Sequence, residues 1–130
     1  MKRWAAVLGS LAMVCLLTAC SSSGTGIFPG PFASQADQVI ADLAAENFTA
    51  VEVKFDPAMM NAARTLPLPK AWADCQDRLG KYRSHGAPTF DPTDQFDLEG
   101  VPVAWANGPG SVIIAFNPNG TIAWLHCGAP

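Results

Sequence analysis

Apolar residues follow a helical period in the first half of the folded region, and the period then changes toward the alternation of strands. Helices are predicted over four stretches, which are residues 35–46, a short segment within 48–55, 57–64 and 69–79. Ser34 and Asp37 fit a capping box before the first helix. Asp56 followed by Pro57 is typical of an N-cap and a first helical position, and Gly80 follows the last stretch at the C-cap position.

The second half of the folded region predicts strands over residues 81–85, 100–106, 111–116 and 121–127. Because helices come first and strands follow as a meander, the predicted fold class is α+β, with N-terminal helices packed on a four-stranded antiparallel sheet. The segment 89–99 contains Asp91, Asp94, Asp97 and Glu99. The spacing of these acids does not fit a calcium loop, so the segment is predicted to be a solvated loop.

Residues 117–120, Asn-Pro-Asn-Gly, predict a type I turn followed by a glycine in the left-handed conformation. The hairpin register that follows pairs Phe116 with Ile122. It also pairs Ile114 with Trp124. One face of the last two strands then carries Val112, Ile114, Phe116, Ile122 and Trp124. We expect the helices to cover the opposite face of this hairpin, which leaves the first face for the first helices, a pocket or a second subunit to cover.

The first twenty residues are typical of a secretory signal peptide. Lys2 and Arg3 precede an apolar run over residues 4–17, which as a helix would rise about 21 Å and could not cross a hydrocarbon core of about 30 Å. The next residues, Leu17-Thr18-Ala19-Cys20, resemble the lipobox of bacterial lipoproteins. This resemblance implies cleavage before Cys20 and acylation of its thiol. The alternative is an ordinary secreted protein that is cleaved at the same place.

The chain therefore divides into a signal peptide over residues 1–19, a lipidated cysteine with a flexible tether over 20–33, and a single domain over 34–130. Two acyl chains would anchor the mature protein outside the cytoplasmic membrane, because each buried CH₂ contributes about 0.8 kcal/mol. Loss of the two basic residues of the signal leaves 6 basic and 11 acidic side chains, a net charge of −5. Such a chain favours neither nucleic acid nor anionic lipid heads, so the lipid is the expected contact with the membrane.

Cysteine usage predicts one disulfide bond. Cys15 belongs to the signal peptide and Cys20 to lipid attachment, which leaves two thiols in an oxidising compartment. A bond between Cys75 and Cys127 would join a helix to the last strand and contribute about 4 kcal/mol by the chain-entropy estimate. One alternative is a metal site that includes His126, although neighbours on a strand point to opposite faces. The other is a nucleophilic thiol, which would need a free sulfur and a partner base.

Several aromatic and aliphatic residues are candidates for a ligand pocket, a partner surface or the core. They are Trp72, Tyr82, Trp105, Ile114, Phe116, Ile122 and Trp124. No catalytic set is apparent, because the run 108–111, Gly-Pro-Gly-Ser, is not the Gly-x-Ser-x-Gly elbow of serine hydrolases. No inward position is assigned to an acid or a histidine. We expect no metal and no cofactor.

Short motifs stand out along the folded region. They are Phe48, Phe55-Asp56-Pro57, Ala71-Trp72, Leu79-Gly80 and the run 115–123, Ala-Phe-Asn-Pro-Asn-Gly-Thr-Ile-Ala. Over about residues 35–127 the chain resembles a family of small extracytoplasmic domains of unknown function. The resemblance implies a cystatin-like or nuclear transport factor 2-like cone, in bacterial lipoproteins that carry it alone or ahead of a serine hydrolase. The acidic insertion over 89–99 and the cysteine pair depart from the family pattern.

The sequence favours a non-enzymatic, lipid-anchored binding or assembly module, whose exposed sheet face meets a protein partner or a second copy of the chain. A carrier or sensor of a small apolar ligand is the second hypothesis, and it requires an enclosed cavity beside Trp105 and Trp124. The third hypothesis is a small enzyme of the isomerase or hydratase type, which such cones sometimes host. It requires an acid or a histidine inside the cavity.

Overall fold

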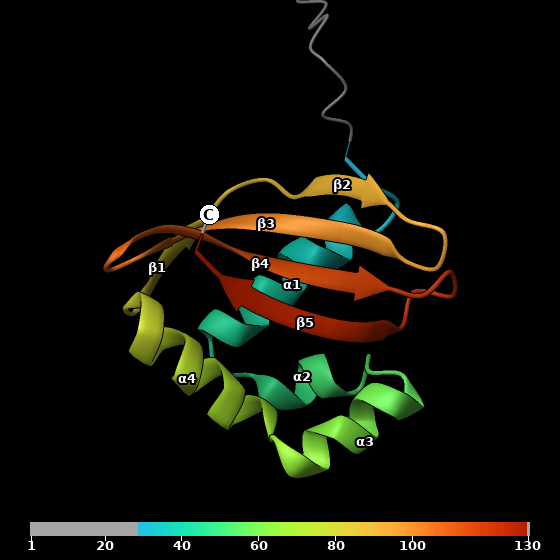
Figure 1. The fold of residues 1–130 in the computed structure, drawn as a ribbon, viewed down its shortest axis with the longest axis horizontal. Helices are drawn as coiled ribbons and strands as arrows, with labels where there is room; N and C mark the ends of the chain where they lie inside the picture. The colour runs from blue at the N-terminus through green and yellow to red at the C-terminus, as the bar shows by residue number, and fades with distance from the viewer. Residues whose placement is uncertain (1–28, 130) are drawn as a thin grey trace, which may run out of the picture.

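The computed structural model describes residues 29–129, within which four helices precede five strands (Figure 1). The helices are α1 (Ala33–Ala44), α2 (Phe48–Glu52), α3 (Pro57–Thr65) and α4 (Leu68–Leu79). The strands are β1 (Tyr82–His85), β2 (Thr89–Pro92), β3 (Asp97–Trp105), β4 (Gly108–Phe116) and β5 (Ile122–Gly128). The predicted α+β class is confirmed. The predicted signal peptide and the lipid attachment site at Cys20 lie outside the described residues.

The sheet is antiparallel, with the strand order β1-β3-β4-β5. Strands β1 and β2 pair with the same edge of β3, β1 near the C-terminal end of β3 and β2 near its N-terminal end. The prediction of four strands was wrong, because β2 forms within the segment 89–99 and β3 begins at Asp97. The Thr93 hydroxyl closes the turn between these strands by donating to the carbonyl of Phe96 at 2.9 Å. The alternation of β3 was hidden in the sequence because Glu99 occupies an inward position where an apolar residue is expected.

A β-bulge in the last hairpin also corrects the predicted register. Phe116 pairs with Ile122 as expected, but the pairing then shifts, and Ile114 lies opposite Leu125 instead of Trp124. As a result Cys127 shares the inward face with Ile114 and Phe116, while Trp124 lies on the opposite face. The face that lacked a cover in the sequence analysis is therefore the face that the helices cover.

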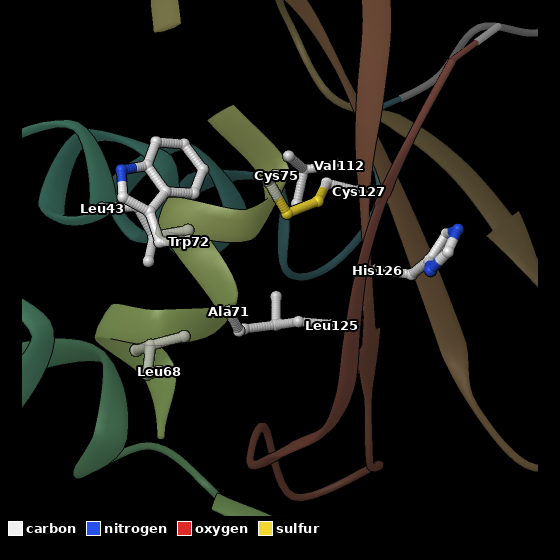
Figure 2. A pocket seen from close by; sticks show the side chains of 9 residues that line it. All are labelled: Leu43, Leu68, Ala71, Trp72, Cys75, Val112, Leu125, His126 and Cys127. Carbon is white, nitrogen blue, oxygen red and sulfur yellow. A yellow bond between two sulfur atoms is a disulfide. The ribbon is translucent and has the colours of Figure 1, made fainter. Parts of the chain in front are cut away.

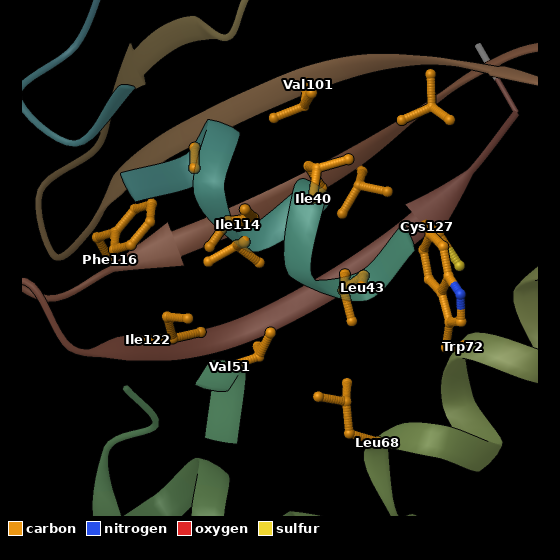
Figure 3. Packing of buried hydrophobic residues seen from close by; sticks show 14 of the residues in the cluster. Ile40, Leu43, Val51, Leu68, Trp72, Val101, Ile114, Phe116, Ile122 and Cys127 are labelled. Atoms are coloured by element: carbon orange, nitrogen blue, oxygen red, sulfur yellow. The ribbon is translucent and has the colours of Figure 1, made fainter. Parts of the chain in front are cut away.

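The core lies between the helices and this inward face of the sheet (Figure 3). In α1 the buried stripe of Val39, Ile40 and Leu43 follows the helical period and packs across β3 and β4. In Figure 1, α1 crosses behind the sheet, and α2, α3 and α4 gather below β5. The inward strand residues with an apolar side chain and less than a tenth of their surface exposed are Val101, Val103, Trp105, Val112, Ile114, Phe116, Ile122 and Cys127.

Helix ends follow the predicted caps in two of three cases. The Asp56 carboxylate accepts from the backbone N–H of Met59 at 2.7 Å, which confirms it as the N-cap of α3. Gly80, with φ of 90°, ends α4 as predicted, because this conformation favours glycine. The capping box before α1 was wrong. Phe32 is the N-cap of α1 without a side-chain bond, and the Asp37 side chain bonds His85 instead.

The chain between α2 and α3 ties the helical layer to the edge strand β5. The backbone N–H of Ile122 donates to the carbonyl of Lys54 at 2.8 Å, and the N–H of Asp56 donates to the carbonyl of Ile122 at 2.9 Å. The Asn117 amide also donates to the second carboxylate oxygen of Asp56 at 2.8 Å. These bonds fix the helices against the last hairpin. Among residues 29–129 no helix combines the length and apolar character that crossing a bilayer requires.

Candidate functional site

The predicted disulfide bond between Cys75 and Cys127 is confirmed (Figure 2). It joins α4 to β5 across 52 residues of sequence, with the two Cα atoms 6.3 Å apart, which lies in the usual range for disulfides. The His126 side chain points to the other side of β5 (Figure 2). It therefore does not share a metal site with Cys127, and the bonded sulfurs are not free nucleophiles.

Two small apolar cavities lie along the seam between α3, α4 and β5. One, of about 60 Å³, lies beside Trp72 and the disulfide, and the other, of about 140 Å³, lies beside Met59 and Phe55. They share Leu68, Ala71 and Leu125 as walls. Sites for drug-sized ligands measure about 300–1,000 Å³, so each of these cavities holds only a few heavy atoms.

The residues predicted to line one pocket or partner face divide between three places. Trp72, Tyr82 and Trp105 form an aromatic cluster, in which the Trp72 ring lies 5.5 Å from Trp105 and 6.2 Å from Tyr82 between centroids. Of the three, only Trp72 also contacts the smaller cavity. Three others of the predicted residues are fully buried in the core, namely Ile114, Phe116 and Ile122. Trp124 alone lies on the uncovered face of the sheet.

We call this uncovered side the open sheet face. No described segment packs on it, and its apolar members are Leu98, Pro102, Ala104, Pro109, Ile113, Ala115 and Trp124. Trp124 lies directly opposite Ala115, and Ala115 is fully buried because it lies between large neighbours on the same face. At the other end of the face, small residues of β1, β3 and β4 leave an open depression of about 370 Å³.

A chain of three hydrogen-bonded polar residues at the edge of the sheet was not predicted from the sequence. His85 Nε2 lies 2.7 Å from Asp37 Oδ1, and His85 Nδ1 lies 2.6 Å from the Tyr82 hydroxyl. Because a carboxylate only accepts, His85 donates from Nε2 to Asp37, and its Nδ1 shares the second hydrogen bond with the Tyr82 hydroxyl. Burial and the charge of Asp37 raise the pKa of Tyr82, which opposes its activation as a nucleophile. The arrangement holds α1 against β1.

Glu99 is the second group that the sequence analysis missed, since it was assigned to a solvated loop. It is fully buried on the inward face of β3, and within residues 29–129 neither carboxylate oxygen has a partner that meets the criteria for a hydrogen bond. Burial raises the pKa of Glu99 most strongly, the Phe32 backbone N–H acts in the opposite direction, and the charge of Asp97 raises it further. A Cβ added at Gly30 would meet Glu99 Oε1 and the Phe90 ring, so the entering chain seals this carboxyl group.

These features define a class of small α+β domain, in which helices cover one face of an antiparallel sheet and a disulfide bond links a helix to the edge strand. A family model described as "Protein of unknown function (DUF3887)" matches residues 36–125, from α1 into β5. The chain belongs to this family. No curated protein and no solved structure matches the chain. The predicted likeness to a domain of unknown function is confirmed, whereas the cone shape and the lipoprotein context stay predictions.

Proposed function

We propose that this protein is a lipid-anchored extracytoplasmic binding module, and that the open sheet face is its binding surface. One observation carries the proposal. Trp124, the largest side chain on that face, is only partly buried and lies among apolar neighbours, although the helices already complete a core on the other face. Antiparallel sheets with one solvated face usually place polar residues there. A contiguous apolar patch around an aromatic residue is typical of an interaction surface.

Two features support the proposed location. The run Leu17-Thr18-Ala19-Cys20 follows an apolar segment, as in lipoprotein signal peptides. The disulfide bond between Cys75 and Cys127 supports an oxidising compartment, because cytosolic thiols are kept reduced. An acidic domain has no electrostatic attraction to anionic lipid heads, so the acyl group at Cys20 would have to retain it on the membrane.

The binding surface is tested by photo-crosslinking in intact cells. A photoreactive residue replaces Trp124 in the full chain, and in a matched control it replaces Val53, which is 71% exposed just after α2 on the helical side. We expect a discrete adduct from position 124 and none from position 53. Equal labelling from the two positions, or no adduct from position 124, would contradict the proposal.

The anchor is tested separately by Cys20→Ala in the full chain. We expect the parent protein in the membrane pellet with the mass of an acylated polypeptide, and the variant in its unprocessed form without the lipid mass. The variant's disulfide, read by alkylation before reduction, should be intact, which separates a failure of lipidation from a failure of folding. A parent protein without fatty modification would contradict the proposal.

The two alternative functions have weaker support from the geometry. The cavities at the helix seam admit only a ligand of a few heavy atoms, and the cavity beside Trp72 reaches neither Trp105 nor Trp124. An enzyme of the isomerase type would require an inward acid, and Glu99 is one. It lines none of the three cavities described above, so none of them leads a substrate to its carboxyl group.

A further inference from the structure

The four residues before α1 close over the buried carboxyl group of Glu99. We call residues 29–32 the entry segment, which lies beside β2 (Figure 1). A Cβ added at Gly30 would clash with both Glu99 Oε1 and the Phe90 ring, so the segment approaches the carboxyl group as closely as a bare backbone allows. The entry segment therefore covers Glu99 on the side where the chain enters the domain.

Side chains, rather than strand pairing, hold the entry segment on the sheet. The Phe32 ring stacks on Phe116, with the ring centroids 4.9 Å apart. Among the described residues, the backbone carbonyls of the segment bond to α1 instead. The Gly30 carbonyl accepts from the N–H of Ala33 at 3.1 Å, and the Phe32 carbonyl accepts from the N–H of Ala36 at 2.8 Å. The segment can therefore leave the sheet without breaking the hydrogen bonds of a strand.

We propose that the entry segment is a latch, which stays closed over Glu99 while this residue carries its proton and opens when the proton is lost. The reason is the cost of burying a charge. Glu99 is fully buried, and neither carboxylate oxygen makes a well-formed hydrogen bond within residues 29–129. An ionised carboxylate lacks water in this place, so an opening that admits water becomes more favourable. The latch lies on the inward face and does not depend on the open sheet face.

Few charged groups act on Glu99. The entry segment and β4 carry none. On β2, Phe90 pairs with Glu99 on the inward face, so the neighbouring Asp91 lies on the opposite face. Asp97, two residues earlier on β3, shares the face of Glu99, and its charge favours the protonated form. The titratable groups of α1 are bonded elsewhere, Asp37 to His85 and Asp42 to Gln38.

The direction of the pH dependence follows from where the proton binds. In the closed state, burial raises the pKa of Glu99 above 4.5, whereas in the open state water reaches the carboxyl group and the pKa returns toward 4.5. Between these two values the open state binds fewer protons, so the opening equilibrium rises by up to about tenfold for each pH unit. It levels off above the closed-state pKa. The latch is therefore closed in acid and released as pH rises.

Opening changes the joint between the domain and the chain that precedes it. Four residues in extended conformation span about 13 Å, so release of the entry segment lengthens the predicted tether by up to that distance. Release also uncovers the rings of Phe90 and Phe116, against which the segment packs. In a lipid-anchored protein, the state of the latch would set how far the domain extends from the membrane.

The test is hydrogen–deuterium exchange of the full chain, non-reduced and in detergent, read by mass spectrometry between pH 4 and pH 8. The parent and Glu99→Gln are compared at each pH, because the intrinsic exchange rate is then the same for both. In the peptide 29–36 we expect equal exchange at pH 4, and exchange at least about tenfold faster in the parent at pH 8. Peptides from α4 should exchange alike in the two proteins at every pH.

Two further variants complete the test. Gly30→Ala forces the entry segment away from Glu99, so the peptide 29–36 should exchange fast at pH 4 as well, and this result keeps the test informative if Glu99→Gln fails to fold. Asp91→Asn, on the opposite face of the same hairpin, is the matched control and should keep the rise of the parent. A parent that exchanges like Glu99→Gln at pH 8 would overturn the latch. An equal rise in the α4 peptides would also overturn it, because the whole domain would then be opening.

Discussion

The buried carboxyl group of Glu99 predicts that stability falls as pH rises, and Glu99→Gln tests this directly. Both carboxylate oxygens are fully buried without a well-formed hydrogen bond among the described residues, although the backbone N–H of Phe32 favours the charged form. Burial therefore raises the pKa of Glu99 above its ordinary value of 4.5, and the charge of Asp97 adds to this. The substitution keeps the shape of the side chain and removes its titration.

The sign follows from proton binding. The unfolded chain releases the Glu99 proton near pH 4.5, whereas the folded chain releases it at a higher pH. Between these two values the folded state binds one more proton than the unfolded state, so the free energy of unfolding falls by up to about 1.4 kcal/mol for each pH unit. The contribution levels off above the pKa of the folded state. The Glu99→Gln variant lacks this pH dependence, so its free energy of unfolding, taken relative to that of the parent, should increase from pH 4.5 upward.

The assay is denaturant unfolding of the non-reduced full chain, followed by tryptophan fluorescence at several values between pH 4 and pH 8. Asp91→Asn removes a carboxylate from the same hairpin and serves as the matched control. The free energy of unfolding of Glu99→Gln, relative to that of the parent, should increase with pH. The free energy of unfolding of Asp91→Asn, relative to that of the parent, should not show this increase. A pH-independent difference for Glu99→Gln would refute the placement of Glu99 as a sealed, protonated acid.

The two remaining predictions concern stability. Replacing Cys75 and Cys127 together by serine should lower the free energy of unfolding by about 4 kcal/mol, because the disulfide bond closes a 52-residue loop. A loss of less than about 1 kcal/mol, measured by denaturant titration, would contradict this prediction. Asp56→Ala should cost about 1 kcal/mol through loss of the N-cap bond to Met59. The Met59 and Asn117 donors lower the pKa of Asp56 below 3.8, so the charge-dependent part of its stabilisation is present above pH 3.8 and lost as pH falls through the folded value. An Asp56→Ala variant whose loss of stability is as large below that pH as at neutral pH would contradict this account.

Local signals predicted the elements of this fold well. The stripe of Val39, Ile40 and Leu43 identified α1, Asp56 before Pro57 identified the start of α3, and Gly80 identified the end of α4. The cysteine pair was identified because only two thiols remained for a bond. These predictions succeeded because each depends on residues that are close in sequence or on simple counting.

Long-range placement was less predictable. The bulge in β5 moved Trp124 to the open sheet face, and a one-residue shift of this kind leaves no clear mark in the apolar pattern. Asp37 looked like a capping residue because its true partner, His85, lies 48 residues away. Glu99 looked solvated because acids are rarely buried without a partner. A strict alternation around Val101 was the one signal that could have placed Glu99 inward.

Modification of His126 by diethyl pyrocarbonate tests most directly whether the open sheet face is occupied in the membrane. His126 is exposed on that face, and a free histidine derivative added to both samples serves as the reference, because His85 borders the depression on the same face. We predict that His126 is modified several-fold more slowly, relative to this reference, in native membranes than in dilute detergent. Equal relative rates in the two conditions would contradict the assignment of this face as the binding surface.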